Sequence, residues 1–324
     1  MAKQPPQALD CELRETVTDR HSYAAMLERL SKASVDRHWE PYLDIPWDDP
    51  DYRIDQDDPR WRLTEIDRLG AHPWYQAQPR EIQTRIGLWR VATAMKIGMQ
   101  FENLLKRGLL AYAYNLPNGS PEFRYVYHET IEEGHHGMMF QEFVNRTGFP
   151  IHGMPRPLRR LAVLSPLIPR LDPELFFFFV LGGEDPIDYV QRRTLRSGAG
   201  LHPLLERIMR IHVAEEARHI SFARTYLRRR VPELGWLHRR ALGVTAPVIL
   251  GVMAHIMLGP PRAMVRHFGI PKHVADEAYR KNPAARQELR ACVAKVRALA
   301  AELGLITPVS KRIWRLMGIW NDQG

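Results

Sequence analysis

Residues 132–136 of this 324-residue chain read EEGHH, and residues 212–219 read HVAEEARH. Each segment contains a glutamate followed three residues later by a histidine. Residues three apart lie on the same face of an α-helix, so each carboxylate and its imidazole point the same way. Two such helices packed antiparallel, with one carboxylate from each of two further helices, can bind two iron or manganese ions inside a four-helix bundle. The segments therefore predict an all-α fold around a two-metal site.

A helical period of apolar residues extends on both sides of these segments. The predicted helices, most of them ending close to Gly or Pro, cover residues 80–114, 121–146, 173–196 and 203–230, with at least two more near 236–258 and 273–303. No alternating strand pattern and no repeat accompanies them. We therefore predict a four-helix bundle at residues 80–230, within a helical domain that covers residues 80–324.

Residues 1–79 have a different composition. They are rich in Pro, Trp and Asp, as in IPWDDP at residues 45–50. Proline interrupts helices because it lacks a backbone N–H and clashes with the preceding turn. We therefore predict an irregular N-terminal arm with short helices, which packs on the core through its tryptophans.

The segment at 132–136 offers two registers, Glu132 with His135 or Glu133 with His136. The face of Glu133 and His136 continues through aromatic residues and should point inward. The face of Glu132 and His135 continues to Glu142 and should meet water. We therefore choose Glu133 and His136 as ligands.

The segment at 212–219 is less ambiguous. Glu215 lies three residues before Arg218, which cannot bind a metal ion, whereas Glu216 lies three residues before His219, which can. His212 lies one turn before Glu216 on the same apolar stripe. A buried glutamate without a partner is costly, so this stripe favours a metal site over a plain core face.

The other two bundle helices must each supply one carboxylate. Glu102 lies on an apolar face of the first helix, and Glu184 follows the apolar run FFFFVLGG of the third. Asp185 is the main competitor of Glu184, and it could instead hydrogen-bond a ligating histidine. The two glycines and Pro186 predict a local loosening of this helix, such as a bulge.

The predicted ligand set has four carboxylates and three imidazoles: Glu102, Glu133, His136, Glu184, His212, Glu216 and His219. Four carboxylates neutralise two divalent cations, and mixed oxygen and nitrogen donors suit iron or manganese. One Glu-x-x-His unit is usually a surface accident, and a lone buried glutamate can simply pair with an arginine. Two units on inward helix faces, each preceded by a helix with a carboxylate, favour the metal site.

This combination resembles the para-aminobenzoate N-oxygenase (AurF-like) family. The resemblance rests on His-x-x-x-Glu-x-x-His, the earlier Glu-x-x-His and the two single glutamates, and it covers residues 80–230. It implies a ferritin-like fold, a di-iron centre held by the seven residues, a homodimer, and oxidation of an arylamine nitrogen by dioxygen. Such a reaction needs outside electrons, so a reductase or a ferredoxin-like carrier is an expected partner.

Three other functions fit the same pattern. The first is di-iron oxidation of carbon by a hydroxylase or an acyl desaturase. The second is ferroxidase activity without an organic substrate. The third is a binding or structural protein that holds no metal. Iron content separates the last from the others, and product analysis separates nitrogen from carbon oxidation.

Composition narrows the remaining classes. The net charge is +9, but the densest basic cluster, Arg228–Arg230, lies at a predicted helix end, where cations are favourable, so no nucleic-acid partner is expected. Two cysteines are too few for a thiolate zinc site. The N-terminus has no apolar signal sequence, and the apolar run at 243–258 is short and interrupted, so we expect a cytoplasmic protein without a membrane span.

Overall fold

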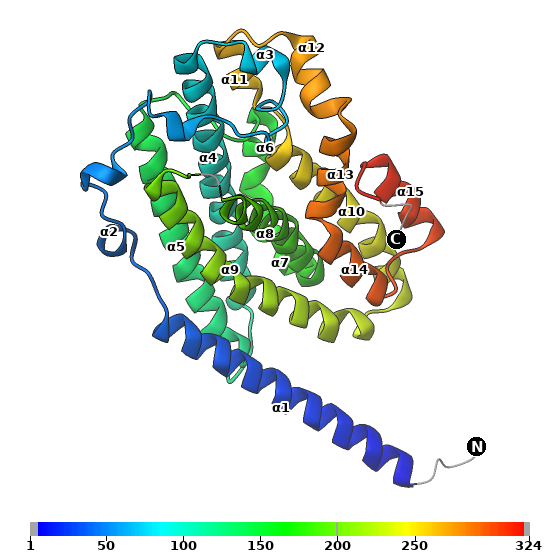
Figure 1. Cartoon of the computed structure of the whole chain (residues 1–324). Helices are drawn as coiled ribbons and strands as arrows, with labels where there is room; N and C mark the ends of the chain where they lie inside the picture. The colour runs from blue at the N-terminus through cyan, green and yellow to red at the C-terminus, as the bar shows by residue number, and fades with distance from the viewer. Residues whose placement is uncertain (1–5, 199, 321–324) are drawn as a thin grey trace.

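The computed structural model describes residues 6–198 and 200–320, with side chains from residue 21 onward. All regular structure in these residues is helical, which confirms the all-α prediction. The four bundle helices are α4 (Arg80–Ala113), α5 (Glu122–Thr147), α8 (Pro173–Arg196) and α9 (Pro203–Arg230). Helix α4 packs on α5 and helix α8 packs on α9, as Figure 1 shows. The helical period of the sequence is therefore sufficient to locate the bundle.

Local signals explain why the bundle helices begin and end where they do. Helix α8 starts with Asp172, whose side chain accepts a hydrogen bond from the backbone N–H of Leu175 at 2.8 Å. Helix α9 starts with His202, which caps it in the same way. Helix α5 ends at Gly148, whose φ of 69° lies in the left-handed region that glycine adopts without strain.

The N-terminal arm differs from the prediction over its first half. Residues Pro6–Asp36 form one long helix, α1, so the expectation of an irregular arm with only short helices is wrong there. The reason is the distribution of proline: after Pro6, which suits the first turn of a helix, the next proline is Pro41. Helix α1 packs on α5 and α9 and runs along the base of the bundle (Figure 1).

The second half of the arm consists of short helices joined by irregular segments. It contains four short helices, each of which begins with a proline: α2 (Pro41–Asp44), η1 (Pro50–Tyr52), η2 (Pro59–Trp61) and α3 (Pro73–Gln76). Trp47 and Trp61 are buried, and the Trp61 ring stacks on His202 with centroids 4.2 Å apart. The arm therefore fixes the start of α9.

The segment that joins α5 to α8 is also helical, and so is the C-terminal region after α9. Helices α6 (Arg156–Leu161), η3 (Ala162–Leu167) and α7 (Ile168–Leu171) join α5 to α8. After η4 (Val231–Glu233) come α10 (Trp236–Leu258), α11 (Arg262–His267), α12 (Lys272–Ala275), η5 (Asp276–Arg280), α13 (Pro283–Cys292), α14 (Ala294–Glu302) and α15 (Pro308–Leu316). The predicted helix near 273–303 is thus divided, because Asn282 and Pro283 start a new helix within it.

One stretch, residues 236–267, is long and apolar enough to cross a membrane by composition alone. Within it, α10 packs on α8 and α15 and buries Leu242, Ala246, Leu250 and Ala254. These contacts are those of a core helix. The buried apolar residues form two clusters, one around α8, α10 and the C-terminal helices and one beneath the arm. The predicted ligands come from helices that border both clusters.

Candidate metal centre

The side chains of the seven predicted ligands lie together inside the bundle, and none of them is exposed to solvent. The donor atoms of Glu102, His136, His212 and Glu216 all lie within 4.8 Å of one another. Those of Glu102, Glu133, Glu184 and Glu216 form a second group within the same limit. Four helices thus bring residues more than one hundred positions apart to one place.

Glu133 and Glu216 lie at the middle of this centre. The Nδ1 atom of His219 is 3.0 Å from Glu133 Oε1 and 3.2 Å from Glu216 Oε2. The Nδ1 atom of His136 is 3.2 Å from Glu216 Oε1 and 3.8 Å from Glu133 Oε2. Each central glutamate therefore faces both histidines, and either could contribute to holding a metal ion beside His136 or His219.

His212 reaches the centre through its other ring nitrogen. Its Nε2 atom lies 3.5 Å from Glu102 and 3.5 Å from Glu216, and its Nδ1 atom lies 2.9 Å from the amide oxygen of Gln191. An amide oxygen only accepts, so Nδ1 carries the proton and Nε2 keeps its lone pair toward the carboxylates. Burial lowers the pKa of His212 to about 4, so its ring is neutral, as a metal ligand must be.

The unpartnered atoms in this centre fit bound cations. Both carboxylate oxygens of Glu102, Glu133 and Glu184 are buried without a hydrogen-bond partner, and so is His212 Nε2. Buried polar atoms are normally hydrogen-bonded, and a cluster of this kind calls for a positive charge. Burial, together with Glu216 and Glu133, raises the pKa of Glu184 well above its usual value. Two divalent cations would remove both difficulties, and the donors suit iron or manganese.

His136 and His219 show the same demand for positive charge. Burial alone would lower the pKa of each ring, but the surrounding glutamates outweigh it and raise both pKa values well above the usual range. Without metal, these histidines are therefore protonated and hold the carboxylates together. A metal ion would replace those protons.

The position of Glu132 differs from the sequence prediction for its face of α5. Sequence reasoning expected this residue to meet water, but it is only 2% exposed. Its Oε2 atom lies 2.8 Å from Nε2 of His219, and its Oε1 atom lies 2.8 Å from the Arg218 guanidinium. The expectation failed because α1 and α9 cover this face of α5. Glu132 orients the imidazole of His219.

Glu215 is another residue whose role sequence reasoning missed. Its Oε2 atom lies 2.8 Å from Nε2 of His136, and its Oε1 atom lies 3.5 Å from the same Arg218 nitrogen that binds Glu132. Each of the two histidines thus has a carboxylate behind it, and one guanidinium joins the two carboxylates. The signal was present in the sequence, because both segments contain a pair of adjacent glutamates.

Asp185, the competitor of Glu184, has a different partner. It is buried and lies 2.5 Å from the Arg224 guanidinium, so it pairs with an arginine rather than with a ligating histidine. Glu184 is the α8 carboxylate whose oxygen belongs to the ligand group. The structure thus favours Glu184 for the α8 position.

The predicted bulge in α8 is wrong, because α8 is a continuous α-helix from Pro173 to Arg196. The glycine before Glu184 has another role. A Cβ atom added at Gly183 would lie 1.9 Å from the Phe101 ring of α4. Gly183 therefore allows α8 to approach α4 closely, directly beside Glu102 and Glu184.

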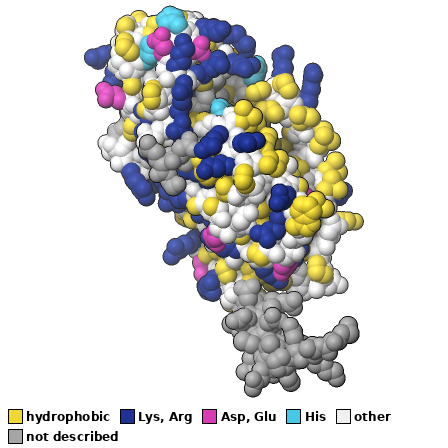
Figure 2. All heavy atoms as spheres, turned by 90° about the vertical axis from the view of Figure 1, so that its right-hand side faces the viewer, with side chains coloured by type: hydrophobic (Ala, Val, Ile, Leu, Met, Phe, Trp, Pro, Cys, Tyr) yellow, Lys and Arg dark blue, Asp and Glu magenta, His cyan; other side chains and the backbone are white. Residues whose placement is uncertain are grey.

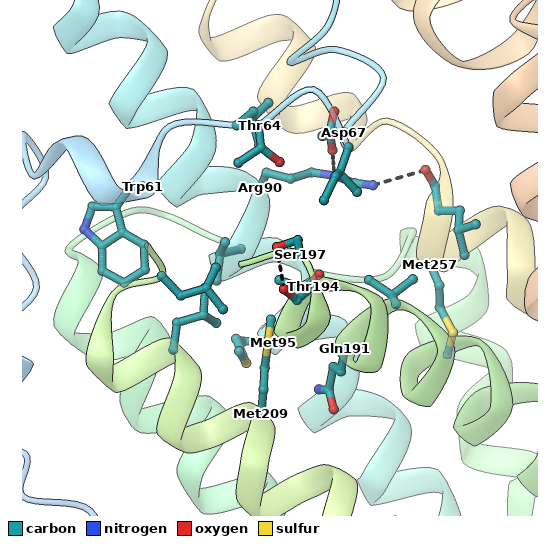
Figure 3. Close-up of a pocket in the computed structure, with 18 of the residues that line it drawn as sticks. Trp61, Thr64, Asp67, Arg90, Met95, Gln191, Thr194, Ser197, Met209 and Met257 are labelled. Carbon is teal, nitrogen blue, oxygen red and sulfur yellow. Dashed lines mark hydrogen bonds and ion pairs between the residues drawn. The ribbon is translucent and has the colours of Figure 1, made fainter. Parts of the chain in front are cut away.

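A cavity of about 290 Å³ lies next to the centre (Figure 3). Its inner end is lined by Met95, Met209 and Gln191, the last of which also holds His212. Phe140 lines the cavity as well, and its ring centroid lies 5.0 Å from that of His212. The cavity therefore reaches the residues that surround one half of the centre.

The opposite end of the cavity is polar. Arg90 lies there, 3.4 Å from Asp67 and bonded to the backbone oxygens of Gly259 at 2.9 Å and Leu258 at 3.1 Å (Figure 3). Tyr279 also donates to Asp67 at 3.1 Å. The Arg90 guanidinium is thus fully engaged by the protein itself, and the inner part of the cavity is mainly apolar.

Comparison with known proteins agrees with this geometry. A family model described as P-aminobenzoate N-oxygenase AurF matches residues 20–304. The uncharacterized proteins Mb0909 of Mycobacterium bovis and Rv0885 of Mycobacterium tuberculosis are each 46% identical to this chain over 303 residues, which cover 94% of this chain and 89% of each relative. The matched range contains all seven predicted ligands and the arm from residue 20 onward. The chain therefore belongs to the P-aminobenzoate N-oxygenase AurF family, whose members are ferritin-like di-iron proteins.

Proposed function

We propose that this chain is a non-haem di-iron oxygenase that uses dioxygen to oxidise the nitrogen of an arylamine-type small molecule. The observation that carries the proposal is the group of seven buried, largely unpartnered donors beside an apolar cavity. The family match supports the reaction class.

The geometry supports a division of the ligands between two ions. Glu102, His136 and His212 would hold one, and Glu184 and His219 would hold the other, with Glu133 and Glu216 between them. Iron held by these residues would supply the electrons for dioxygen activation, and manganese is the alternative metal.

The protein's own part is to hold these donors in a dry interior and to fix their orientation. Glu132, Glu215 and Gln191 each bind the ring nitrogen that faces away from the centre. Such partners set both the tautomer and the orientation of a ligating imidazole. The zero exposure of all seven ligands keeps bulk water from the reacting groups.

The cavity supports an organic substrate. An apolar protein cavity of about 150 Å³ can bind benzene, so a cavity of about 290 Å³ suits a molecule built on one aromatic ring. Phe140 and the two methionines offer aromatic and sulfur contacts to such a ring. A ferroxidase without an organic substrate would not need this space, so the cavity favours oxygenation of a small molecule.

The same proposal includes an outside electron donor, such as a reductase or a ferredoxin-like carrier, and a cytoplasmic homodimer. A di-iron enzyme that oxidises carbon, as a hydroxylase or an acyl desaturase, is the main alternative, because metal ligation is the same for both. The two differ in the atom that receives oxygen, which product analysis can identify.

The experiment is iron loading followed by a single turnover. The purified chain is loaded anaerobically with ferrous iron, and we expect two iron ions per chain. The loaded protein is then exposed to ¹⁸O₂ with a panel of arylamines, and mass spectrometry should find label on nitrogen. Fewer than about one iron per chain would contradict the di-iron site. Label on carbon alone would support the carbon oxidase instead. The variant Glu216→Ala serves as the inactive control.

A further inference from the structure

The sequences of α5 and α9 can be aligned without a gap over eight residues, which extend past the two Glu-x-x-His units toward the N-terminus. Residues 129–136 of α5 read ETIEEGHH, and residues 212–219 of α9 read HVAEEARH. In this alignment each central glutamate matches the other, each supporting glutamate matches the other, and His136 matches His219. The first position is His212 in α9 and Glu129 in α5. Since His212 faces the centre, its counterpart should face the centre from the opposite side.

The structure places Glu129 there. It is completely buried, and neither of its carboxylate oxygens has a hydrogen-bond partner. Its donor atom lies within 4.8 Å of those of Glu133 and His219. A fully buried carboxylate aimed at a cluster of metal-ligand side chains, with only the Tyr125 hydroxyl nearby outside that cluster, requires a cation or a proton.

We propose that Glu129 is an eighth donor of the centre and binds the ion held by His219, as His212 binds the ion held by His136. This inference rests on the proposed two-metal site. It makes the two ions unequal, because one would have two imidazoles and the other one imidazole and an additional carboxylate. Carboxylate oxygen is the harder donor, so the ion beside Glu129 would be the one better stabilised in the ferric state.

The test is the variant Glu129→Gln, which keeps the shape of the side chain and removes its charge. Its matched control is Glu174→Gln, another buried glutamate, which pairs with Arg230 outside the centre. Mössbauer spectra of each protein loaded with ⁵⁷Fe(II) resolve the two ions, and titration with Fe(II) measures their affinities.

We expect Glu129→Gln to change one of the two ferrous signals and to weaken one of the two affinities at least tenfold, while Glu174→Gln leaves both unchanged. His212→Asn should change the other signal. Two wild-type affinities and an unchanged spectrum in Glu129→Gln would overturn the inference. A wild-type chain that binds no iron would instead refute the proposed function, so the two failures are distinguishable.

A second and independent observation concerns the surface. Five large apolar side chains, each exposed by 61–81%, protrude from η3, its flanking helices and the start of α10: Leu161, Val163, Leu171, Trp236 and Leu237. The two segments meet where His238 lies 3.0 Å from Asp172. We call these five residues the α7–α10 patch. Exposed apolar residues in such a group mark an interaction site.

The charge around the patch is mainly basic, and its nearest acidic residues, Asp172 and Glu233, pair with His238 and Arg230. The sequence contains no Asp or Glu between Glu142 and Asp172, or between Glu233 and Asp276. Five arginines of these stretches are exposed and form no ion pair with any described residue: Arg156, Arg159, Arg160, Arg170 and Arg240. On the face that Figure 2 shows, hydrophobic side chains lie beside Lys and Arg, with few acidic groups among them.

Exposed apolar side chains surrounded by unpaired arginines favour one kind of partner over another. A second copy of the chain docked through the same patch would bring arginines against arginines, because a two-fold interface pairs a surface with itself. An anionic lipid surface complements both features, since apolar tips and a tryptophan enter the interfacial region while arginines bind the headgroups. The geometry points to peripheral binding of the α7–α10 patch to an anionic membrane.

The test is co-sedimentation with vesicles of phosphatidylcholine alone or with about 30% phosphatidylglycerol. We expect binding only to the anionic vesicles, and weaker binding at high salt. The double variants Leu161→Ser/Leu171→Ser and Arg159→Gln/Arg160→Gln should each reduce binding about tenfold or more. The controls Leu43→Ser and Arg124→Gln change exposed residues of α2 and α5 and should have no effect.

Two results would overturn this second inference. One is equal sedimentation with both kinds of vesicle, or equal binding by wild type and patch variants. The other is a loss of oligomer in Leu161→Ser/Leu171→Ser, measured by analytical ultracentrifugation, which would assign the patch to a second copy of the chain.

Discussion

Helices α5 and α9 carry the same Glu-Glu-x-x-His sequence, yet neither completes its own half of the centre. Glu132 of α5 supports His219 of α9, and Glu215 of α9 supports His136 of α5. The two helices therefore exchange their supporting carboxylates. Residues that appear to belong to the outer face of one helix acquire their role only through the other helix.

The exchange is not symmetric in charge. Arg218 of α9 binds both supporting carboxylates, whereas α5 has His135 at the matching position, and this residue contacts the ring of His38 instead. Helix α9 thus supplies the cation that compensates both helices. The comparison predicts that α9 is the more sensitive of the two to substitution.

The largest expected effect comes from the residues that both helices share. We expect Glu133→Ala or Glu216→Ala to lose both ions, because each glutamate faces both histidines, and to lower activity more than about 100-fold. Iron per chain and arylamine turnover check this. Glu142→Ala, on the partly exposed side of α5, should retain two ions. A variant of either central glutamate that keeps two ions would show that it does not bridge them.

The next effect separates the helices. Arg218→Met should destabilise the fold by about 3–5 kcal/mol, because it removes the guanidinium that two buried carboxylates share and leaves each with only its histidine. Arg218→Lys should restore part of the loss. The matching change in α5, His135→Ala, should cost about 1 kcal/mol or less. Urea unfolding measures all three, and equal losses at positions 135 and 218 would disprove the asymmetry.

A smaller effect tests the exchange itself. Glu132→Gln and Glu215→Gln should each weaken metal binding by about 10–100-fold, which is usual for the partner of a ligating histidine. The perturbed ion should be the one held by the histidine of the opposite helix. ⁵⁷Fe Mössbauer spectra of the two variants should therefore differ. Identical spectra would mean that the carboxylates do not act on separate ions.

The smallest effect concerns how the two helices start. His202 caps α9 through an unprotonated Nδ1, whereas α5 has no side-chain cap. Burial, with a contribution from Arg60, lowers the pKa of His202 below its usual value. The unfolded chain therefore takes up this proton first, so stability is full above about pH 6.5 and falls as the pH drops toward the folded pKa.

The variant His202→Asn keeps a capping side chain but cannot be protonated. We expect it to remove a pH-dependent loss of about 1 kcal/mol. Urea unfolding of both proteins at pH 8 and pH 5 measures the difference. If wild type and variant lose the same stability between these pH values, the cap is not the source.

Much of the fold could be predicted from the sequence because its signals are local. Proline, glycine and the apolar period place the ends of the bundle helices within one or two residues of those observed. Helix α1 was missed because a composition shared by residues 1–79 was applied to a part of that range that contains almost no proline. Helix boundaries depend on which residue stands at each position, so the average composition of a region does not predict them.

The centre was predictable for a different reason. Residues three or four apart on an apolar face must point inward together, and this spacing predicted Glu133, His136, His212, Glu216 and His219. Glu102 and Glu184 were predicted as single carboxylates on apolar faces of the other two bundle helices, and the structure brings all seven together. Glu132, Glu215 and Glu129 required tertiary information. Glu132 shares its face with charged residues, and only the packing of α1 and α9 shows that part of that face is buried. The cavity could not be predicted, because its walls come from the arm, the bundle and the C-terminal helices.

Because Gly183 has no side chain, it sets the distance between α4 and α8 and forms no bond of its own. The Phe101 ring occupies the space that a Cβ atom at position 183 would need. The distance between α4 and α8 is therefore set by this ring packed against the glycine backbone. The carboxylates of Glu102 and Glu184 project from the neighbouring positions of the same two helices. Any larger residue at 183 would wedge the helices apart unless position 101 shrank with it. The packing thus couples the sizes of residues 101 and 183, and with them the separation of Glu102 and Glu184.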